Sequence, residues 1–157
     1  KEAGGEVLAF MGDGSYLMGN SDVFSSVLSG HKVIFIVCDN GGFAVINRLQ
    51  MNTGGAEFNN LYASSRRARD ARVDFVQHLA AMGATAELVP SLADLPAAFA
   101  RARDSDRSYG LVIPVQAYSW LEGSAWWEVG VPEVSTRADV RVARGEYEAE
   151  RKHQRWT

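Results

Sequence analysis

Two glycine-containing turns hold the residues best suited to chemistry in this sequence. The first turn reads GDGS and contains Asp13, and the second reads DNGGF and contains Asn40. Each turn directly follows a short apolar run of the kind that forms a buried parallel strand. Ligands of open α/β sheets bind beyond the carboxyl ends of the strands. We therefore expect Asp13 and Asn40 to meet at one edge of a sheet.

These residue types in these turns fit a magnesium diphosphate. Small residues such as Gly14 and Ser15 let an anion approach the backbone N–H groups at the start of a helix. The Asp13 carboxylate would repel a phosphate unless a cation lay between them, and magnesium takes oxygen ligands of this kind. Asn40 offers a neutral oxygen, and the glycine pair ending at Gly42 lets a main-chain carbonyl turn toward the metal. The alternative is two ordinary turns with polar caps, because short glycine-rich motifs match often.

Alternating strands and helices must position these turns. The pattern predicts an α/β fold, a mostly parallel sheet with helices on both faces. The first two strands are expected to be central and covered on both faces, and Pro114 indicates a free edge or a bulge near the end of the last strand. The predicted strands are residues 6–11, 32–38, 85–89 and 110–116, and the predicted helices are residues 17–29, 73–82 and 92–105.

Local signals refine the helices. Leu17, Ser21, Phe24 and Leu28 recur at helical spacing, Val27 widens this stripe, and together they predict the buried face of the first helix. Glycines at positions 30 and 83 predict helix ends. Ser91 and Asp94 resemble a capping box that opens the last helix.

Composition sets the class of protein. With 157 residues, 46% hydrophobic content and a net charge of −3, the chain can bury a core, and nucleic-acid binding is not expected. The apolar runs are too short for a membrane span, and the beginning lacks a signal-peptide pattern, so a cytoplasmic location is predicted. Cys38 lies in an apolar run and is predicted to be a structural thiol. Residues 1–135 are expected to form the domain, and residues 136–157 a charged tail, helical or partly disordered.

Several features leave alternatives open. The loop at residues 52–62 either closes over a ligand, which we favour, or only connects two elements. Asn47 and Gln50 are expected on the surface, with contact to substrate as the alternative. The basic run at residues 66–72 indicates a solvated face or a subunit contact. Packing within the chain, or else a subunit interface, is expected for the aromatic residues Trp120, Trp126 and Trp127.

The two turns together resemble the cofactor motif of thiamine diphosphate enzymes. The resemblance implies that Asp13, the Asn40 amide and the Gly42 carbonyl bind Mg²⁺, and that the fold is the diphosphate-binding domain, truncated at its N-terminus. The usual motif has asparagine where this sequence has Asp39, which puts a neighbouring hydrogen bond in doubt. The implied binding residues for thiamine diphosphate are Gly12, Asp13, Gly14, Ser15, Asn40, Gly42 and Phe43.

Two further stretches, residues 39–50 and 124–135, resemble the family of hydrolases that open trihydroxycyclohexane-1,2-dione in inositol catabolism. The resemblance implies hydrolysis of a carbon–carbon bond in a cyclic diketone and assembly into a homo-oligomer. It also implies a pyrimidine-binding domain, usually from another subunit, whose glutamate activates the cofactor. Glu2, Glu6 and Glu57 do not lie in that glutamate's sequence context, so no catalytic residue is assigned. We therefore expect the 157-residue chain to have no turnover alone.

Two other functions share some of these features. An acetolactate synthase-like carboligase or a 2-oxo acid decarboxylase would use the same turns. A non-catalytic Rossmann-like nucleotide-binding module would need a third glycine that the stretch GDGSYL lacks.

Overall fold

The computed structural model describes residues 5–120 and 134–153. Trp126, Trp127, Glu2 and most of the stretch 124–135 lie outside the described residues. The chain divides into two compact units. The first consists of Lys1–Phe43 and Arg67–Gln116, and the second of Ala44–Arg66 and Ala117–Thr157.

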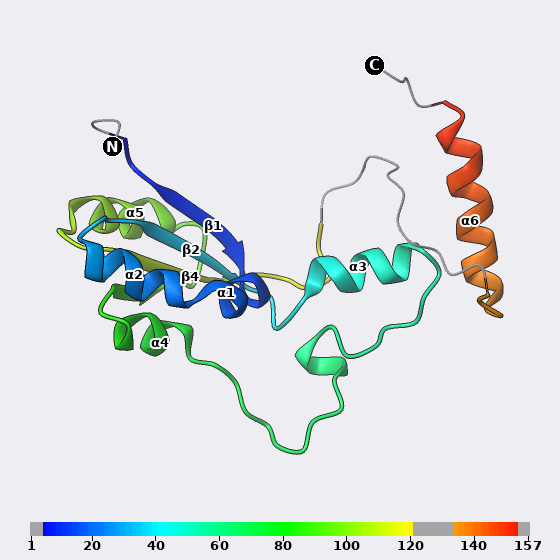
Figure 1. Cartoon of the computed structure of the whole chain (residues 1–157), viewed down its shortest axis with the longest axis horizontal. Helices are drawn as coiled ribbons and strands as arrows, with labels where there is room; N and C mark the ends of the chain where they lie inside the picture. Colours follow the sequence, from blue (N-terminus) through cyan, green and yellow to red (C-terminus); the bar gives the residue numbers. More distant parts are fainter. Residues whose placement is uncertain (1–4, 121–133, 154–157) are drawn as a thin grey trace. The chain divides into compact units, whose positions relative to one another are not determined.

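A parallel four-stranded sheet lies at the centre of the first unit (Figure 1). Its strands stand in the order β1-β2-β4-β3. All neighbouring strands are parallel, so each crossover connection returns the chain to the same end of the sheet. The predicted α/β fold with a parallel sheet is confirmed. The strands are β1 (Leu8–Gly12), β2 (Ile34–Asp39), β3 (Thr85–Leu88) and β4 (Tyr109–Pro114).

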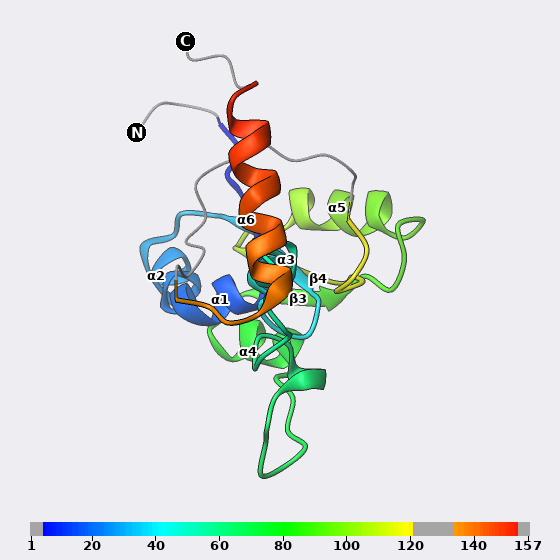
Figure 2. The same cartoon turned by 90° about the vertical axis from the view of Figure 1, so that its right-hand side faces the viewer.

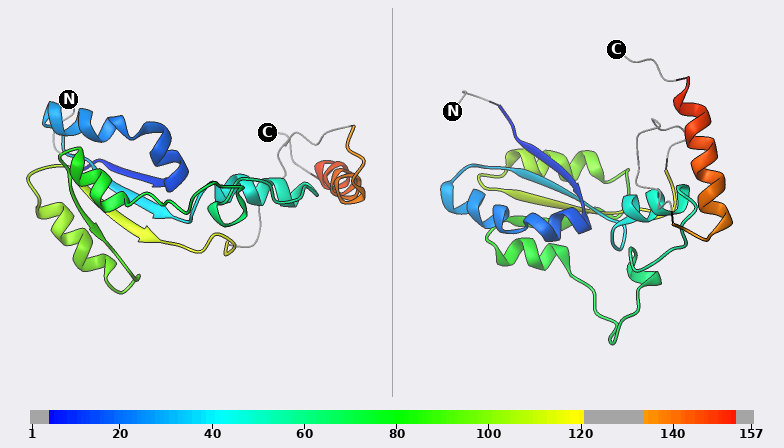
Figure 3. Two further views of the ribbon diagram at one scale, coloured as in Figure 1. Left: turned by 90° about the horizontal axis from the view of Figure 1, so that it is seen from below. Right: turned by 45° about the vertical axis from the view of Figure 1, so that its right-hand side comes forward.

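Helices cover both faces of this sheet, as expected (Figure 3). Side chains alternate along β2, so that Phe35 and Val37 face one way and Ile34 and Ile36 the other. The first face packs against α1 (Asp13–Gly19), α2 (Ser21–Ser29) and α4 (Phe75–Ala81). The second face packs against α5 (Leu95–Asp104).

β1 is an edge strand among the described residues, so the prediction that it is central is wrong. Leu8 and Phe10 stand beside Ile34 and Ile36 on the face that α5 covers only in part. Phe10 is 71% exposed and Leu8 is also exposed. The apolar run predicts burial on both faces, but the described elements cover only one face of this strand.

The first predicted helix is divided into α1 and α2 at Asn20, whose side-chain amide donates to the Leu17 carbonyl. The predicted buried face is wrong except at Val27, which is half-buried against the core. Tyr16 and Val23 are buried against the sheet, because apolar residues occur on several sides of the helices and the interruption at Asn20 selects a different one. The expected core residues Leu17, Phe24 and Leu28 are exposed.

The predicted glycine helix ends are confirmed. Gly30 closes α2 in the left-handed conformation, with φ of 67°, and its N–H donates to the Val27 carbonyl. Gly83 follows α4 with φ of 89°.

The predicted capping box is not formed at the start of α5. The Ser91 hydroxyl donates to Asp94 Oδ2 at 2.6 Å, and Asp94 itself precedes the helix.

The end of β4 explains the position of Pro114. β4 is an interior strand, yet its neighbour β3 ends at Leu88, which pairs with Val112. The missing N–H of Pro114 therefore falls on a side of β4 where no strand remains to be paired.

The second unit contains α3 (Ala44–Asn52), a short 3₁₀ turn η1 (Tyr62–Ser64) and α6 (Ala138–Arg151). The Gly54 carbonyl accepts a hydrogen bond from Arg137 Nε at 3.1 Å, close to the start of α6. α6 is the helix expected in the charged tail, and the domain boundary at residue 135 stays a prediction. Over residues 5–120 and 134–153, every helix is too short or too polar to cross a membrane.

Candidate cofactor and metal site

The two predicted turns meet at the carboxyl ends of β1 and β2, the end of the sheet that faces the viewer in Figure 2. Asp13 is the first residue of α1 and is only 3% exposed. Its Oδ1 accepts a hydrogen bond from the Gly14 N–H at 3.0 Å. Its Oδ2 accepts one from the Gly42 N–H at 2.7 Å. One carboxylate therefore joins the ends of two neighbouring strands.

The Asn40 side-chain amide lies against the same carboxylate. One of its terminal atoms is 2.8 Å from the Gly42 carbonyl oxygen and 3.1 Å from Asp13 Oδ1. If this atom is the amide nitrogen, it donates hydrogen bonds to both oxygens. If it is Oδ1, three oxygens converge at separations close to the roughly 3 Å between neighbouring ligands of an octahedral magnesium ion. A rotation of the amide exchanges the two arrangements.

The electrostatics of Asp13 favour a cation beside it. Burial raises the pKa of Asp13, and the nearby Asp39 carboxylate raises it further, against the hydrogen bonds from the Gly42 and Gly14 N–H groups. Asp39 Oδ1 accepts from the Gly41 N–H at 3.1 Å, which is the hydrogen bond that the aspartate makes in this position. A positive ion would stabilise the carboxylate that burial disfavours.

The donor set fits magnesium. Asp13, Asn40 and the Gly42 carbonyl supply oxygen only, and oxygen is what hard divalent cations prefer. Across the described residues, no group of three or more His, Cys, Asp or Glu side chains is placed to hold a metal. A site with one carboxylate and two neutral oxygens leaves positions for phosphate oxygens, as magnesium sites in phosphate-binding proteins do.

Gly14 has a different neighbour from the expected anion. A Cβ atom placed on Gly14 would lie 2.5 Å from the ring of Phe43, so the glycine makes room for an aromatic side chain. Ser15 is exposed in the first turn of α1, and Gly12 lies next to the Asn40 amide. All the sequence-predicted binding residues thus lie in the two turns of the first unit, and their contact with a cofactor stays a prediction.

Tyr16, which follows the first turn, connects α1 to α4. Its hydroxyl lies 2.8 Å from His78 Nδ1 on α4, and its ring packs edge-on against Phe75. Burial raises the pKa of Tyr16 to about 12, so the phenol keeps its proton. The sequence signal for this contact, a tyrosine directly after GDGS, does not identify the distant partner.

Cys38 is half-buried at the end of β2. Burial raises the pKa of its thiol, and Asp13 raises it further. A protonated thiol is a weak nucleophile, which agrees with the predicted structural role.

In the second unit, Asn47 is 1% exposed, so its expected surface position is wrong. Its Nδ2 donates to Glu57 Oε1 at 2.7 Å, because the loop after α3 folds back over the helix. Gln50 is half-buried, and its Oε1 accepts from Asn60 Nδ2 at 2.6 Å. These amides therefore organise the loop.

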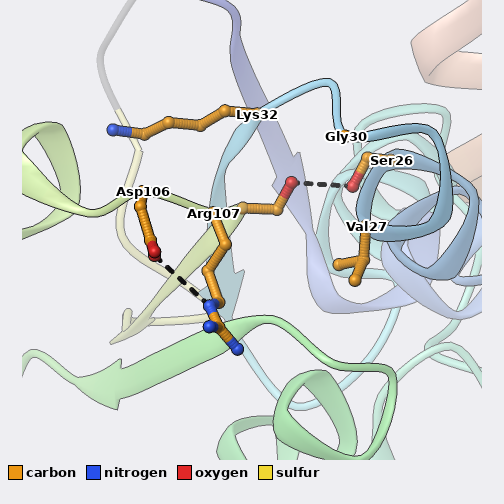
Figure 4. Close-up of a pocket in the computed structure, with 7 residues that line it drawn as sticks. Ser26, Val27, Gly30, Lys32, Asp106 and Arg107 are labelled. Atoms are coloured by element: carbon orange, nitrogen blue, oxygen red, sulfur yellow. Dashed lines mark hydrogen bonds and ion pairs between the residues drawn. The ribbon is translucent and has the colours of Figure 1, made fainter.

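A separate cavity of about 260 Å³ lies at the amino ends of β2 and β4 (Figure 4). Lys32 Nζ donates to the Arg103 and Ser105 carbonyls at 2.6 Å each, and Arg107 pairs with Asp106. These charged groups already have structural partners. The cavity is also at the opposite end of the sheet from Asp13 and is not a cofactor candidate.

Known proteins resemble this chain along most of its length. A protein from Bacillus cereus (strain AH820) named 3D-(3,5/4)-trihydroxycyclohexane-1,2-dione hydrolase is 35% identical over 145 residues, 88% of this chain and 22% of that protein. The protein of the same name from Listeria monocytogenes serotype 4b (strain F2365) is 32% identical over 151 residues, 96% of this chain and 24% of that protein. The chain thus spans about a quarter or less of the length of these curated relatives.

Solved structures support the fold. A thiamine diphosphate-dependent 4-hydroxybenzoylformate decarboxylase from Rhodococcus jostii RHA1 superposes with a TM-score of 0.59 at 21% identity, over 71% of this chain and 20% of that one. Benzoylformate decarboxylase from Polynucleobacter necessarius gives a TM-score of 0.61 at the same identity and coverage.

A family assignment follows from a match to a family model over more than half of the chain. The family described as "Thiamine pyrophosphate enzyme, C-terminal TPP binding domain" matches residues 1–113, which include both turns, strands β1 to β3 and all of β4 except its last residue. The match favours a thiamine diphosphate-binding domain over the alternative of a Rossmann-like nucleotide-binding module. The chain belongs to the C-terminal, thiamine diphosphate-binding domain family of thiamine pyrophosphate enzymes.

Proposed function

We propose that this chain supplies the magnesium-diphosphate site of an enzyme that hydrolyses a carbon–carbon bond in trihydroxycyclohexane-1,2-dione or a close cyclic diketone. The relatives that carry this activity in their names are 32–35% identical over most of the chain. Because the chain spans 22–24% of their length, the proposed activity is that of a longer protein.

The observation that carries the proposal is the convergence of Asp13, the Asn40 amide and the Gly42 carbonyl. In our proposal these groups hold Mg²⁺, and the glycines and Ser15 of the first turn receive the diphosphate. Asp13 also accepts the Gly42 N–H, so it fixes the second turn while it offers its other oxygen to the metal. When bound, thiamine diphosphate supplies an electron sink for cleavage of a bond beside a carbonyl.

The remaining parts of the proposed active site come from outside this chain. We propose a homo-oligomer in which a pyrimidine-binding domain, from another subunit, provides the activating glutamate. Glu6 is occupied in another way, since its Oε1 pairs with Arg103 Nε at 3.0 Å. The proposed hydrolysis breaks the carbon–carbon bond beside a carbonyl group. The hydroxyl of water goes to the carbonyl carbon, which becomes a carboxylic acid, and the proton goes to the other carbon, so the ring opens.

Calorimetric titration with thiamine diphosphate tests the metal site. We expect binding that requires Mg²⁺ in the full-length protein, and a loss of about tenfold to a hundredfold in affinity for Asp13→Ala, because a charged ligand is removed. Asp22→Ala is the matched control, since Asp22 is an exposed carboxylate on α2. Binding that is independent of Mg²⁺, or equal in the two variants, would overturn the metal site.

Turnover of the full-length protein tests the substrate class. Trihydroxycyclohexane-1,2-dione, pyruvate and benzoylformate are offered in parallel, and the products are identified by mass spectrometry. Hydrolysis of the dione, with no conversion of pyruvate or benzoylformate, supports the proposal. Decarboxylation or carboligation of a 2-oxo acid, without hydrolysis of the dione, would contradict it.

A further inference from the structure

Three polar side chains meet in the second unit, away from the two turns in the sequence. Glu57 Oε1 accepts a hydrogen bond from Asn47 Nδ2 at 2.7 Å and another from the Tyr118 hydroxyl at 2.7 Å. Asn47 comes from α3, Glu57 from the loop that follows it, and Tyr118 from the segment after β4. Side chains that are far apart in the sequence thus converge on one carboxylate oxygen. We call them the Glu57 cluster.

Asn47 carries an unsatisfied acceptor. The residue is 1% exposed, and its Oδ1 has no hydrogen-bond partner among the described residues, while its Nδ2 is bound to Glu57. A buried polar atom without a partner destabilises the folded state, and such atoms are rare in folded proteins. An unpaired oxygen of this kind calls for a donor that arrives with a ligand.

Glu57 is arranged to accept a second set of hydrogen bonds. Both donors use Oε1, and within the described part of the chain no hydrogen bond to Oε2 is found. The Glu57 side chain belongs to an exposed residue, so a ligand can reach it. The hydrogen bond from Tyr118 to Glu57 is the first cause of the raised pKa of Tyr118, so the phenol stays a donor. The cluster therefore presents acceptor oxygens held by fixed donors.

The loop that carries Glu57 is held in place by α3. Gln50 Oε1 accepts from Asn60, and Gln50 Nε2 donates to the Ala56 carbonyl, next to Glu57. The Gly55 N–H donates to the Gln50 carbonyl at 2.9 Å. A carboxylate fixed from both sides loses little conformational entropy when it binds a ligand.

We propose that the Glu57 cluster is a binding subsite for the hydroxyl groups of a polyol ring. Acceptor oxygens on Glu57 and Asn47 complement O–H donors, and the chemistry has no need of a charged ligand. The inference deepens the proposed function and rests on it, because the dione named for the relatives carries three hydroxyl groups. Glu57 and Asn47 are here substrate-binding residues, and Tyr118 is a positioning residue that acts through Glu57.

Steady-state kinetics of the full-length enzyme, loaded with thiamine diphosphate and Mg²⁺, tests the subsite. For Glu57→Gln we expect KM for the trihydroxy dione to rise about tenfold to a hundredfold, with kcat changed less than about twofold. Tyr118→Phe should raise KM by a smaller factor, because Glu57 keeps its bond from Asn47. Glu146→Gln is the matched control, since it removes an exposed carboxylate from α6 and should change neither parameter.

Two readouts separate a subsite from a merely structural role. The inhibition constant of cyclohexane-1,2-dione, which lacks the hydroxyls, and the calorimetric affinity for thiamine diphosphate should both be unchanged in Glu57→Gln. An unchanged KM for the trihydroxy dione, or a parallel rise in the inhibition constant of cyclohexane-1,2-dione, would overturn the inference.

Failure of the proposed function gives a different result. If the wild-type enzyme leaves the trihydroxy dione intact, the proposed activity is wrong, and myo-inositol becomes the probe. Calorimetric binding of myo-inositol that Glu57→Gln weakens would still support a polyol subsite. No binding of myo-inositol by the wild-type protein would then overturn the subsite as well.

Discussion

A single hydrogen atom in place of a side chain decides the packing of the first turn. Phe43 lies against Gly14, and a Cβ atom on Gly14 would meet the Phe43 ring at 2.5 Å. We predict that Gly14→Ala lowers the free energy of unfolding by about 1–3 kcal/mol, the usual cost of overpacking. Urea denaturation, followed by circular dichroism, measures this difference.

Gly145→Ala is the control for that substitution. Gly145 also lies within a helix, α6, and a Cβ atom there would meet nothing within 4 Å. Alanine is the better helix former, so Gly145→Ala should raise the free energy of unfolding by up to about 1 kcal/mol. Adding Phe43→Ala to Gly14→Ala should restore much of the stability that Gly14→Ala loses. Equal changes in the free energy of unfolding for Gly14→Ala and Gly145→Ala would refute the packing argument.

At the scale of elements, one hydrogen bond joins α1 to α4. The Tyr16 hydroxyl lies 2.8 Å from His78 Nδ1, and Tyr16 is buried. We predict that Tyr16→Phe costs about 1 kcal/mol of stability, because His78 loses a partner that water replaces only in part. A double-mutant cycle with His78→Ala, measured by thermal denaturation, should give a coupling energy of similar size. Additive effects would mean that the two side chains do not interact.

A second contact between elements responds to acid. Glu87 on β3 accepts hydrogen bonds from Arg101 on α5 and from Tyr109 on β4. The Arg101 bond is the main cause that lowers the pKa of Glu87 from its ordinary 4.5. The stabilisation from Glu87 is therefore complete above the unfolded pKa and is lost as the pH falls through the lower pKa of the folded state.

The prediction concerns Glu87→Gln. This variant should be less stable than the wild type near pH 7, and the difference should shrink as the pH falls below 4.5, since the wild type then loses the same ionised group. Urea denaturation at a series of pH values checks this, with Glu146→Gln as the exposed control. A difference that is independent of pH would count against the ionised Glu87.

The same scale explains what the sequence could and could not predict. The strands and the meeting of Asp13 with the Asn40 turn follow from apolar runs and from parallel topology, both local or general signals. The buried face of α1 and α2 does not follow, because apolar side chains on several sides leave the choice to tertiary packing, which selects Tyr16. Asn47 is polar and buried only because Glu57 folds back onto it, a contact that helical periodicity does not encode.

At the scale of the whole molecule, the first unit leaves apolar side chains uncovered. Phe10 is exposed on the open face of β1, and Phe24 and Leu28 are exposed on α2. Phe10 and α2 lie on opposite faces of the sheet, and each exposed apolar surface favours association. We predict that the purified chain self-associates as its concentration rises, and that Phe10→Lys combined with Phe24→Lys reduces this association.

Sedimentation velocity over a range of concentrations measures the effect. Phe58→Lys is the control, because Phe58 is an equally exposed phenylalanine in the loop of the second unit. It should leave the association unchanged. A chain that stays monomeric at every concentration, or an equal effect of the control, would show that these faces do not associate.

The strand order also determines how the chain can fold. β1 and β2 follow one another closely in the sequence, but β2 must also pair with β4. The elements α3, η1, α4, β3 and α5 all lie between Ile34 of β2 and its partner Tyr109 of β4. Closing so long a loop costs entropy before any contact rewards it, and pairings of this kind fold slowly. On the ribosome, the β1–β2 pair emerges with its apolar faces open long before β4 exists. We therefore expect the β2–β4 pairing to be the slow step in the folding of the domain.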